Sequence, residues 1–398
     1  MTDTTNPVVR SAWFYLVLLW LAGVGLRLTI LAVPPVLPLI HHDLALSEKE
    51  IGVLSALPAL LLGLAAIPGS LTTARLGAHR SCLLGLVLVA LAGAARGIGP
   101  STPMLFGMTL LMGAGAAIMQ PTLPSLVGEW FPHRAGFATA VYANGLLISE
   151  ALAPTVTLPL VLPWVGGSWE LSFVAWSVPV ALTALLFAAT PRRRPSTRLA
   201  QSPRWWPDWR DPLSWQIGLM LGGTGGTYFW ANTFLPDYLH AIGQPRLVGA
   251  VLSAVNIGQL PASVLILAFA RRLTGNRTVF VASPFLGLLG LVGLLSWSPV
   301  AIVAGAGWLG FCCGMQLILS LALPPLLAPA HDVHRLSAGM FAIGYFVSFV
   351  VQPIGGAIWD ATGVPVTSFA AGGLSIALVL GAAFTLPRVG PVSTARAV

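Results

Sequence analysis

Charged residues are scarce in this sequence. Of its 398 residues, 8% are charged and 56% are hydrophobic, and the mean hydropathy is +0.85. A soluble domain carries about a quarter charged residues. A chain with so little polar surface cannot face water on every side. The composition therefore excludes an ordinary soluble protein and predicts an integral membrane protein.

Lysine is almost absent as well. Lys49 is the only lysine among 20 basic residues, so the other 19 are arginines, and 12 acids oppose them. The pI of about 10.2 would suit a nucleic-acid-binding protein, but the arginines lie between apolar runs and form no basic face. We therefore expect no nucleic-acid partner. Arginines in that position are typical of the cytoplasmic loops of membrane proteins.

The usual signatures of metal sites and enzymes are also missing. Cys82, Cys312 and Cys313 lie in or beside apolar runs without metal-ligand spacing, so we interpret them as packing residues. No Ser-His-Asp or paired-carboxylate pattern is visible, and the histidines lack supporting acids. We expect no metal, no cofactor and no enzymatic activity. No small-residue cleavage site follows the first apolar run, which argues against a cleaved signal peptide.

Apolar runs long enough to cross a bilayer fill most of the chain. A spanning helix needs about 20 residues, and glycine or proline inside a run is tolerated because neighbouring helices satisfy the freed backbone groups. The sequence predicts twelve helical runs, at roughly 13–38, 51–73, 81–98, 103–127, 135–161, 171–190, 213–239, 247–269, 278–297, 299–325, 336–358 and 364–386.

The loops between these runs alternate in charge. The positive-inside rule assigns the arginine-rich loops to the cytoplasm, and an even number of runs places both termini there. We therefore expect a multi-pass protein of the plasma (inner) membrane. The arginine-rich side would hold Arg10, Arg75, Arg80, Arg134, the segment 192–210, Arg271, Arg272, Arg277, Arg335, Arg388 and Arg396, and the other side residues 41–50, Arg96, Glu170, Asp237, Arg246 and Asp360.

The longest polar stretch, TPRRRPSTRLAQSPRWWPDWRDP (190–212), divides the runs six and six. The two halves echo each other, because ARLGAHR (74–80) follows the second run as ARRLTGNR (270–277) follows the eighth. Such a repeat indicates a parallel duplication of six helices. We expect an N-terminal half at 1–190, a cytoplasmic linker at 191–212, and a C-terminal half with a short tail at 213–398.

Three stretches resemble a known family. LPSLVGEWFPHRAGFATAVYANG (123–145) and LSAGMFAIGYFVSFVVQPIGGAIWDATG (336–363) resemble helix signatures of the cyanate permease and 2-nitroimidazole transporter family, a branch of the major facilitator superfamily. GLRL (25–28) resembles that family's first-helix Asn-Leu-Arg-Pro motif, with Arg27 at its arginine. The resemblance implies an all-α membrane fold of twelve transmembrane helices in two six-helix pseudo-repeat halves, and secondary transport by alternating access.

The sequence departs from the family pattern in several places. The superfamily's second-loop pattern, Gly-x-x-x-Asp-Arg-x-Gly, appears at 70–77 with Ala74 at the acidic position, and only Arg75 and Gly77 are kept. The charge pairing of that loop must therefore be weaker or supplied differently. We interpret Arg75, Gly77, Arg80 and Arg134 as residues of the loops that change between conformations.

Arg27 lies about halfway along the first predicted span. A charge at that depth costs about 3 kcal/mol, so it needs a cavity or a counter-charge. One interpretation is an ion pair with Glu150, the only acid clearly at mid-span. The other is anion recognition, because a guanidinium can bind a small anion through two parallel hydrogen bonds. Glu150 is likewise a candidate either for proton coupling or for a structural partner.

Polar residues at helical spacing mark further candidates. They fall on single faces of the seventh, eighth and eleventh runs, as cavity-lining residues do, although single polar groups also join helices. The substrate-binding candidates are Arg27, Gln120, Tyr142, Tyr228, Asn232, Asn256, Gln259, Gln316, Tyr345 and Gln352. The glycine-rich stretches at 107–117 and 222–227 lack the lysine and the strand of a phosphate-binding loop, so they predict close helix packing.

These features predict a secondary active transporter of a small organic or inorganic anion, cyanate-like or a small carboxylate, with protons as a candidate coupling ion. Nothing demands more than a monomer. The alternative is a proton-coupled exporter of small neutral heteroaromatic compounds such as nitroimidazoles, which should tolerate loss of the Arg27 charge. A further alternative is a non-transporting sensor or scaffold whose linker, with Trp205 and Trp206, binds a partner or lipid headgroups. The duplicated halves disfavour a channel.

Overall fold

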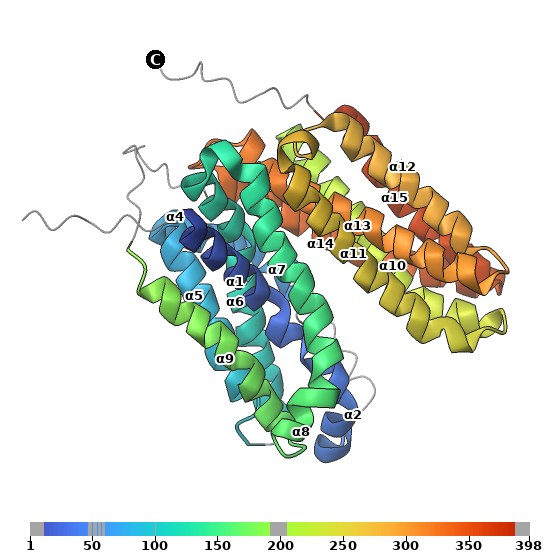
Figure 1. Ribbon diagram of the computed structural model, residues 1–398, viewed down its shortest axis with the longest axis horizontal. Helices are drawn as coiled ribbons and strands as arrows, with labels where there is room; N and C mark the ends of the chain where they lie inside the picture. Colours follow the sequence, from blue (N-terminus) through green and yellow to red (C-terminus); the bar gives the residue numbers. More distant parts are fainter. Residues whose placement is uncertain are drawn as a thin grey trace, which may run out of the picture.

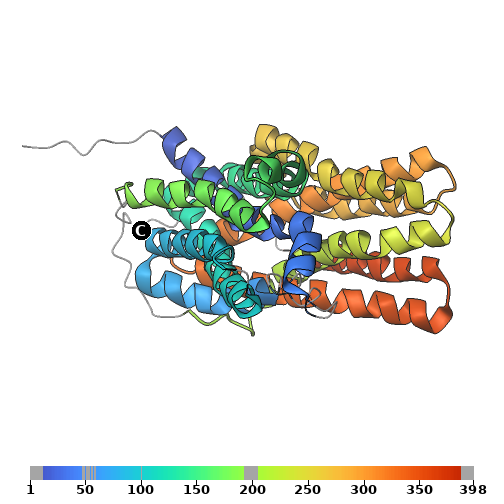
Figure 2. The same ribbon diagram turned by 90° about the horizontal axis from the view of Figure 1, so that it is seen from below.

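The computed structural model describes residues 12–46, 50, 54, 57, 60–99, 101–191 and 205–386. The described helices form two bundles that lie side by side (Figures 1 and 2). The N-terminal bundle holds α1 (Ala12–Leu31), α2 (Val33–Leu44), α4 (Ala66–Leu76), α5 (Ala78–Ala95), α6 (Thr102–Trp130), η1 (Pro132–Arg134), α7 (Ala135–Val156), η2 (Thr157–Val161), α8 (Leu162–Trp164) and α9 (Trp169–Ala188). The C-terminal bundle holds α10 (Pro212–Ala241), η3 (Pro245–Leu247), α11 (Val248–Leu273), α12 (Arg277–Leu294), α13 (Pro299–Leu327), α14 (Val333–Thr362), η4 (Pro365–Ser368) and α15 (Phe369–Thr385).

The predicted helical membrane fold is confirmed. In the described part of the chain, ten helical stretches are long and apolar enough to cross a membrane, and none of these residues lies in a strand. The two remaining predicted runs are represented by α4, of 11 residues, and by α10, of 30 residues. Polar side chains such as Tyr228 and Asn232 dilute the apolar character of α10.

The first predicted run, 13–38, is confirmed as one candidate span, Ala12–Leu37, with a single turn residue, Ala32, between two helical segments. α1 ends at Leu31 and α2 begins at Val33. Pro34 and Pro35 follow at once, and proline removes a backbone donor and crowds the preceding turn. The break comes five residues after Arg27, so the arginine lies one turn from an interruption in its own helix.

Arg96 also differs from its prediction as a loop charge. It is 1% exposed, its Nη2 donates to the backbone carbonyl of Thr29 over 2.8 Å, and its guanidinium carbon lies 4.3 Å from the centre of the Phe173 ring. A hydrogen bond to a carbonyl and contact with a ring face compensate a buried guanidinium. Arg96 therefore ties α5 to α1 close to the break at Ala32.

Glycines allow the helices to cross at close range, as the sequence predicts. A Cβ at Gly145 of α7 would collide with the carbonyl oxygen of Trp20 in α1, and one at Gly310 of α13 with that of Val255 in α11. Gly115, in the first glycine-rich stretch, would meet Gly85 in the same way. The crossing of α6 and α5 at Gly115 has its counterpart in the C-terminal bundle, where a Cβ at Gly305 of α13 would lie 2.8 Å from the carbonyl oxygen of Gly290 in α12.

Replacing Gly145 with Ala should destabilise the protein by about 1–3 kcal/mol, because two helix backbones must separate to admit the methyl group. The measurement is thermal unfolding of the purified chain in detergent. Gly107→Ala is the matched control, because no heavy atom lies within 4 Å of a Cβ built there. Equal melting temperatures for the two variants would contradict the close crossing of α1 and α7.

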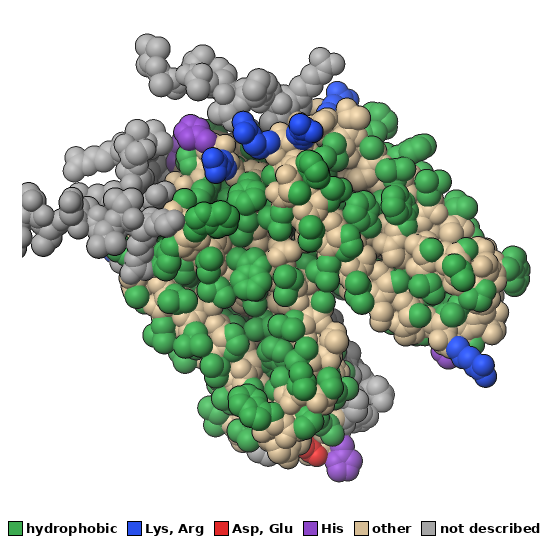
Figure 3. Space-filling model, viewed as in Figure 1, with side chains coloured by type: hydrophobic (Ala, Val, Ile, Leu, Met, Phe, Trp, Pro, Cys, Tyr) green, Lys and Arg blue, Asp and Glu red, His purple; other side chains and the backbone are tan. Residues whose placement is uncertain are grey.

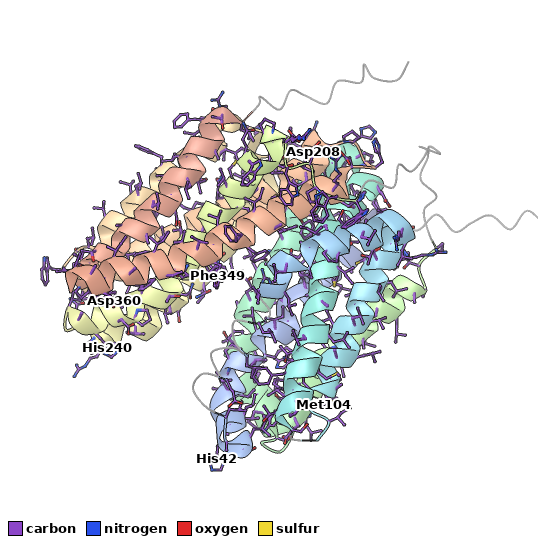
Figure 4. All side chains as sticks on the ribbon, turned by 180° about the vertical axis from the view of Figure 1, so that it is seen from behind. His42, Met104, Asp208, His240, Phe349 and Asp360 are labelled. Carbon is purple, nitrogen blue, oxygen red and sulfur yellow. The ribbon has the colours of Figure 1, made fainter. Side chains whose placement is uncertain are left out.

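The two ends of the molecule differ in charge and in shape. We call one end the arginine-rich face. It carries Arg75, Arg80, Arg134, Arg271, Arg272, Arg277 and Arg335. The bundles meet near that face, where Asp208 lies, and diverge towards His42 and Met104 on one side and His240 and Asp360 on the other (Figure 4). At this second end, which we call the open end, the surface is hollowed between the bundles (Figure 3).

A polar contact joins two helices at the open end. Asp43, near the end of α2, accepts a hydrogen bond of 2.9 Å from the indole Nε1 of Trp169 in α9 and lies 3.1 Å from His42 Nδ1. These hydrogen bonds, from His42 and then from Trp169, lower the pKa of the Asp43 carboxyl below its ordinary value. The carboxylate therefore stays ionised, and the contact weakens only as the pH falls through that lowered pKa.

Candidate functional site

The predicted pairing of Arg27 with Glu150 is present. Arg27 Nε of α1 lies 3.6 Å from Glu150 Oε1 of α7, and each side chain is 16% exposed. The distance is that of an ionic contact, and Arg27 Nε has no hydrogen-bond partner among the described residues. Glu150 therefore offsets the charge of the guanidinium without saturating its donors.

Tyr345 brings the C-terminal bundle to this pair. Its hydroxyl oxygen accepts a hydrogen bond of 2.6 Å from Arg27 Nη2 and another of 2.7 Å from Gln120 Nε2. With two bonds accepted, the hydroxyl hydrogen remains available to donate. Gly63 permits the approach, because a Cβ there would lie 3.0 Å from Tyr345 Cβ. A neutral oxygen from one bundle thus accepts a hydrogen bond from the arginine of the other.

A second polar group lies on α10 and α11. The Tyr228 hydroxyl donates to Asn256 Oδ1 over 2.7 Å, and Asn256 Nδ2 donates to Asn232 Oδ1 over 3.1 Å. Tyr228 is close enough to interact electrostatically with Arg27 and Glu150. The predicted polar faces of the two helices therefore meet each other, and their tyrosine approaches the charged pair.

The remaining predicted residues occupy more varied places. Gln259 of α11 is buried and contacts the Tyr228 hydroxyl. The Gln352 amide nitrogen of α14 lies 3.3 Å from the carbonyl oxygen of Ser348, and its Oε1 is buried without a hydrogen bond among the described residues. Gln352 thus lies about two turns along α14 from Tyr345, towards the open end.

Gln316 and Tyr142 lie inside the bundles, and the structure does not bring them to Arg27. Gln316 Oε1 accepts a hydrogen bond of 2.7 Å from Ser283 Oγ, and the side chain lines a cavity of about 20 Å³ within the C-terminal bundle. Tyr142 is 2% exposed, and its backbone packs against Gly23 of α1. The sequence marked them as polar groups in apolar runs, but this signal does not separate a cavity wall from a bundle interior.

A second contact between the bundles involves residues outside the predicted set. Trp20 Nε1 donates to Asn144 Oδ1 over 3.0 Å, and Asn144 Nδ2 donates to Ser263 Oγ over 2.8 Å. The chain of bonds runs from α1 through α7 to α11. An asparagine in an apolar run was a visible signal, but its partner lies 119 residues away.

At the arginine-rich face, residues 205–208 of the linker bridge the two bundles. Ser70 Oγ of α4 donates to the Trp205 carbonyl oxygen over 2.8 Å. Arg335, near the start of α14, donates through Nε to the Trp206 carbonyl over 2.7 Å, and its Nη2 lies 3.1 Å from Asp208 Oδ2. Arg335 also contacts Asp332 at 3.4 Å. We call this arrangement the linker strap.

The second loop lies at the same face as the linker strap. Arg75, Arg80 and Arg134 are exposed at this face, and Ala74 offers them no carboxylate. Gly77 ends α4 with φ +81°, a conformation that favours glycine. The ion pairs observed at this face among the described residues are those of Arg335 with Asp208 and Asp332.

The reactive residue types show no catalytic or metal-binding grouping in the described part of the chain. Cys82, Cys312 and Cys313 are buried and unbridged, as expected of packing residues. Among the described residues, no three His, Cys, Asp or Glu side chains are placed to hold a metal ion. The chemistry available between the bundles is charge, hydrogen bonding and aromatic contact.

Two bundles of membrane-spanning helices around a buried charged cluster define a membrane transport protein. Residues 19–236 match the Major Facilitator Superfamily, and the chain belongs to this family of transporters, which are not enzymes. It is 28% identical over 367 residues to the 2-nitroimidazole transporter of Escherichia coli (strain K12), covering 91% of this chain and 92% of that protein.

Two other relatives match over a similar share of the chain. The cyanate transport protein CynX of E. coli (strain K12) is 26% identical over 358 residues, covering 87% of this chain and 90% of its own. The uncharacterized transporter YycB of Bacillus subtilis (strain 168) is 27% identical over 367 residues, covering 91% of this chain and 90% of its own. These relatives confirm the resemblance seen in the sequence.

Solved structures match the fold at much lower identity. FucP in the outward conformation superposes with a TM-score of 0.76 at 16% identity, covering 94% of this chain and 99% of that chain. The proton:xylose symporter XylE gives a TM-score of 0.76 at 13% identity, covering 96% and 97%. At such identities the likeness concerns the fold alone.

Proposed function

We propose that this chain is a secondary active transporter that moves a small organic or inorganic anion, cyanate-like or a small carboxylate, across the inner membrane by alternating access. The observation that carries the proposal is the place of Arg27, a guanidinium between the bundles that donates a hydrogen bond to the neutral Tyr345 oxygen. An anionic oxygen in that position makes a stronger, charge-assisted bond than a phenol does.

Tyr345 would link anion binding to the relative position of the two bundles. An incoming anion displaces the Tyr345 hydroxyl oxygen from Arg27 and accepts a hydrogen bond that the same hydroxyl group donates. Arg27 of one bundle and Tyr345 of the other are then joined through the anion. Gln120 adds a donor from α6, and Tyr228 with the asparagines of α10 and α11 forms the opposite wall. The anion thus contacts groups from both bundles, which is the requirement for rocking them about a central site.

Glu150 is the proposed proton-coupling group. While it is ionised, it competes with an anionic substrate for Arg27, at 3.6 Å from Nε. Protonation removes that competition, so proton and anion bind best together and leave together. The coupling ion would then be the proton, and a monomer contains every group that the mechanism needs.

The charge distribution supports an orientation. The arginine-rich face lies in the cytoplasm by the positive-inside rule, and α1 begins and α15 ends at that face (Figure 1). Both termini are then cytoplasmic, and the open end faces outwards.

Export of small neutral heteroaromatic compounds is the second candidate. It is favoured by the relative named as a 2-nitroimidazole transporter and by the ring of Tyr345, which is backed by the buried Phe341 ring at an interplanar angle of 23° with 6.3 Å between centroids. A flat heterocycle would stack on such a surface, and Arg27 would then serve mainly as the partner of Glu150.

Transport by purified protein in proteoliposomes separates the two candidates. Cyanate, nitrite and small carboxylates are offered beside neutral nitroimidazoles, with and without a proton gradient. The proposal expects uptake of at least one anion, increased by a gradient acid on the open-end side. Transport of nitroimidazoles with no anion transported would replace it by the second candidate.

A further inference from the structure

A groove on the flank of the C-terminal bundle lies away from the transport site. It has a volume of about 510 Å³ and runs between the start of α12 and the end of α15. Its lining residues are Arg277, Thr278, Val281, Ala282, Phe285 and Phe384.

The groove changes from polar to apolar along its length. Five lining residues occupy one face of α12, and the helix advances about 12 Å over the eight steps from Arg277 to Phe285. Arg277 and Thr278 mark the arginine-rich face, and Phe285 lies deeper in the membrane. Phe285 is 61% exposed and Phe384 is 58% exposed, so both present rings to the surrounding acyl chains.

The polar end carries unbalanced positive charge. Arg271 and Arg272 are exposed in the last turn of α11, just before α12. The sequence contains no acid between Asp237 and Asp332. Arg277 Nη2 donates to the Phe384 carbonyl oxygen, which holds the guanidinium at the rim. A guanidinium has five N–H donors, so others remain for a ligand.

We propose that this groove binds one anionic phospholipid. Lipid is the solvent on this flank, so the groove is filled by a lipid, and the arginines select a negatively charged headgroup. Arg277 and Thr278 hold the phosphate, and one acyl chain follows Val281, Ala282 and Phe285 against Phe384. The order of polar and apolar groups is that of a phospholipid entering from the arginine-rich face.

Native mass spectrometry of the full chain tests the proposal. The protein is released from detergent that contains equal amounts of phosphatidylglycerol and phosphatidylethanolamine. We expect one phosphatidylglycerol to be retained preferentially by the wild type. Arg277→Gln should reduce that retention about fivefold, since each basic residue near the surface contributes about 1 kcal/mol. Arg277→Lys, which keeps the charge, should retain more lipid than Arg277→Gln.

Arg246→Gln is the matched control, because Arg246 is an exposed arginine at the open end. It should retain phosphatidylglycerol as the wild type does. Phe285→Ala should weaken the binding of both lipids equally, because the acyl-chain contact does not depend on the headgroup. Unfolding temperatures equal to that of the wild type show that the variants are folded. An equal loss in Arg246→Gln, or no preference for the anionic lipid in the wild type, would overturn the proposal.

Discussion

Glu150→Gln is expected to lose about 2 kcal/mol of stability, because it leaves the Arg27 guanidinium between the bundles without a counter-charge. The two side chains are only 16% exposed, so water replaces little of the lost interaction. Arg27→Gln combined with Glu150→Gln should recover most of the loss, since a neutral pair needs no compensation. Transport driven by a proton gradient should be absent from both variants.

Thermal unfolding of the wild type, the two single variants and the double variant measures this coupling as a double-mutant cycle. The cycle should give a coupling free energy well above zero. Gln316→Leu is a comparison variant, because it removes a polar group from inside the C-terminal bundle and touches neither charge. Additive effects of the Arg27 and Glu150 changes would show that the contact contributes nothing to stability.

Arg335→Gln is expected to open the arginine-rich face. It removes the bond to the Trp206 carbonyl and the contacts with Asp208 and Asp332. If this change destabilises the closed conformation by about 1.4 kcal/mol, the equilibrium shifts about tenfold towards the conformation that is open at that face.

A cysteine at Gly128 can report this opening. A Cβ there would lie 3.5 Å from Val333 Cγ2, between α6 and α14, so the thiol is covered while the bundles meet. In a chain whose native cysteines are replaced, the maleimide reaction at Gly128→Cys should become about tenfold faster when Arg335→Gln is added. Arg210→Gln, an exposed change in the same segment, should leave the rate unchanged. An unchanged rate in Arg335→Gln would mean that the linker strap does not hold this face closed.

Hydropathy was sufficient to predict most of the fold. Lipid imposes one requirement, a long apolar helix, so span length can be read from composition alone. The break at Ala32 is a local feature, and Pro34 with Pro35 was a readable signal. The burial of Arg96 was not readable, because its partners at Thr29 and Phe173 come from other helices.

The candidate site was predictable only in part. Arg27 and Glu150 stood out because charges are so rare at mid-span that each is almost the only possible partner of the other. The contact of Arg27 with Tyr345 spans 318 residues, and nothing local in either helix indicates it. The linker strap escaped prediction for a related reason: two of its acceptors are backbone carbonyls, which carry no sequence signal.

The most direct test of the account is anion uptake by Arg27→Gln in proteoliposomes, compared with wild type and Arg27→Lys. We expect uptake to fall at least about 100-fold in Arg27→Gln, because two charge-assisted hydrogen bonds are lost. Arg27→Lys should retain partial activity, since it keeps the charge and loses the planar fork. Anion uptake at the wild-type rate by folded Arg27→Gln would contradict the central claim and leave Arg27 as a structural partner of Glu150.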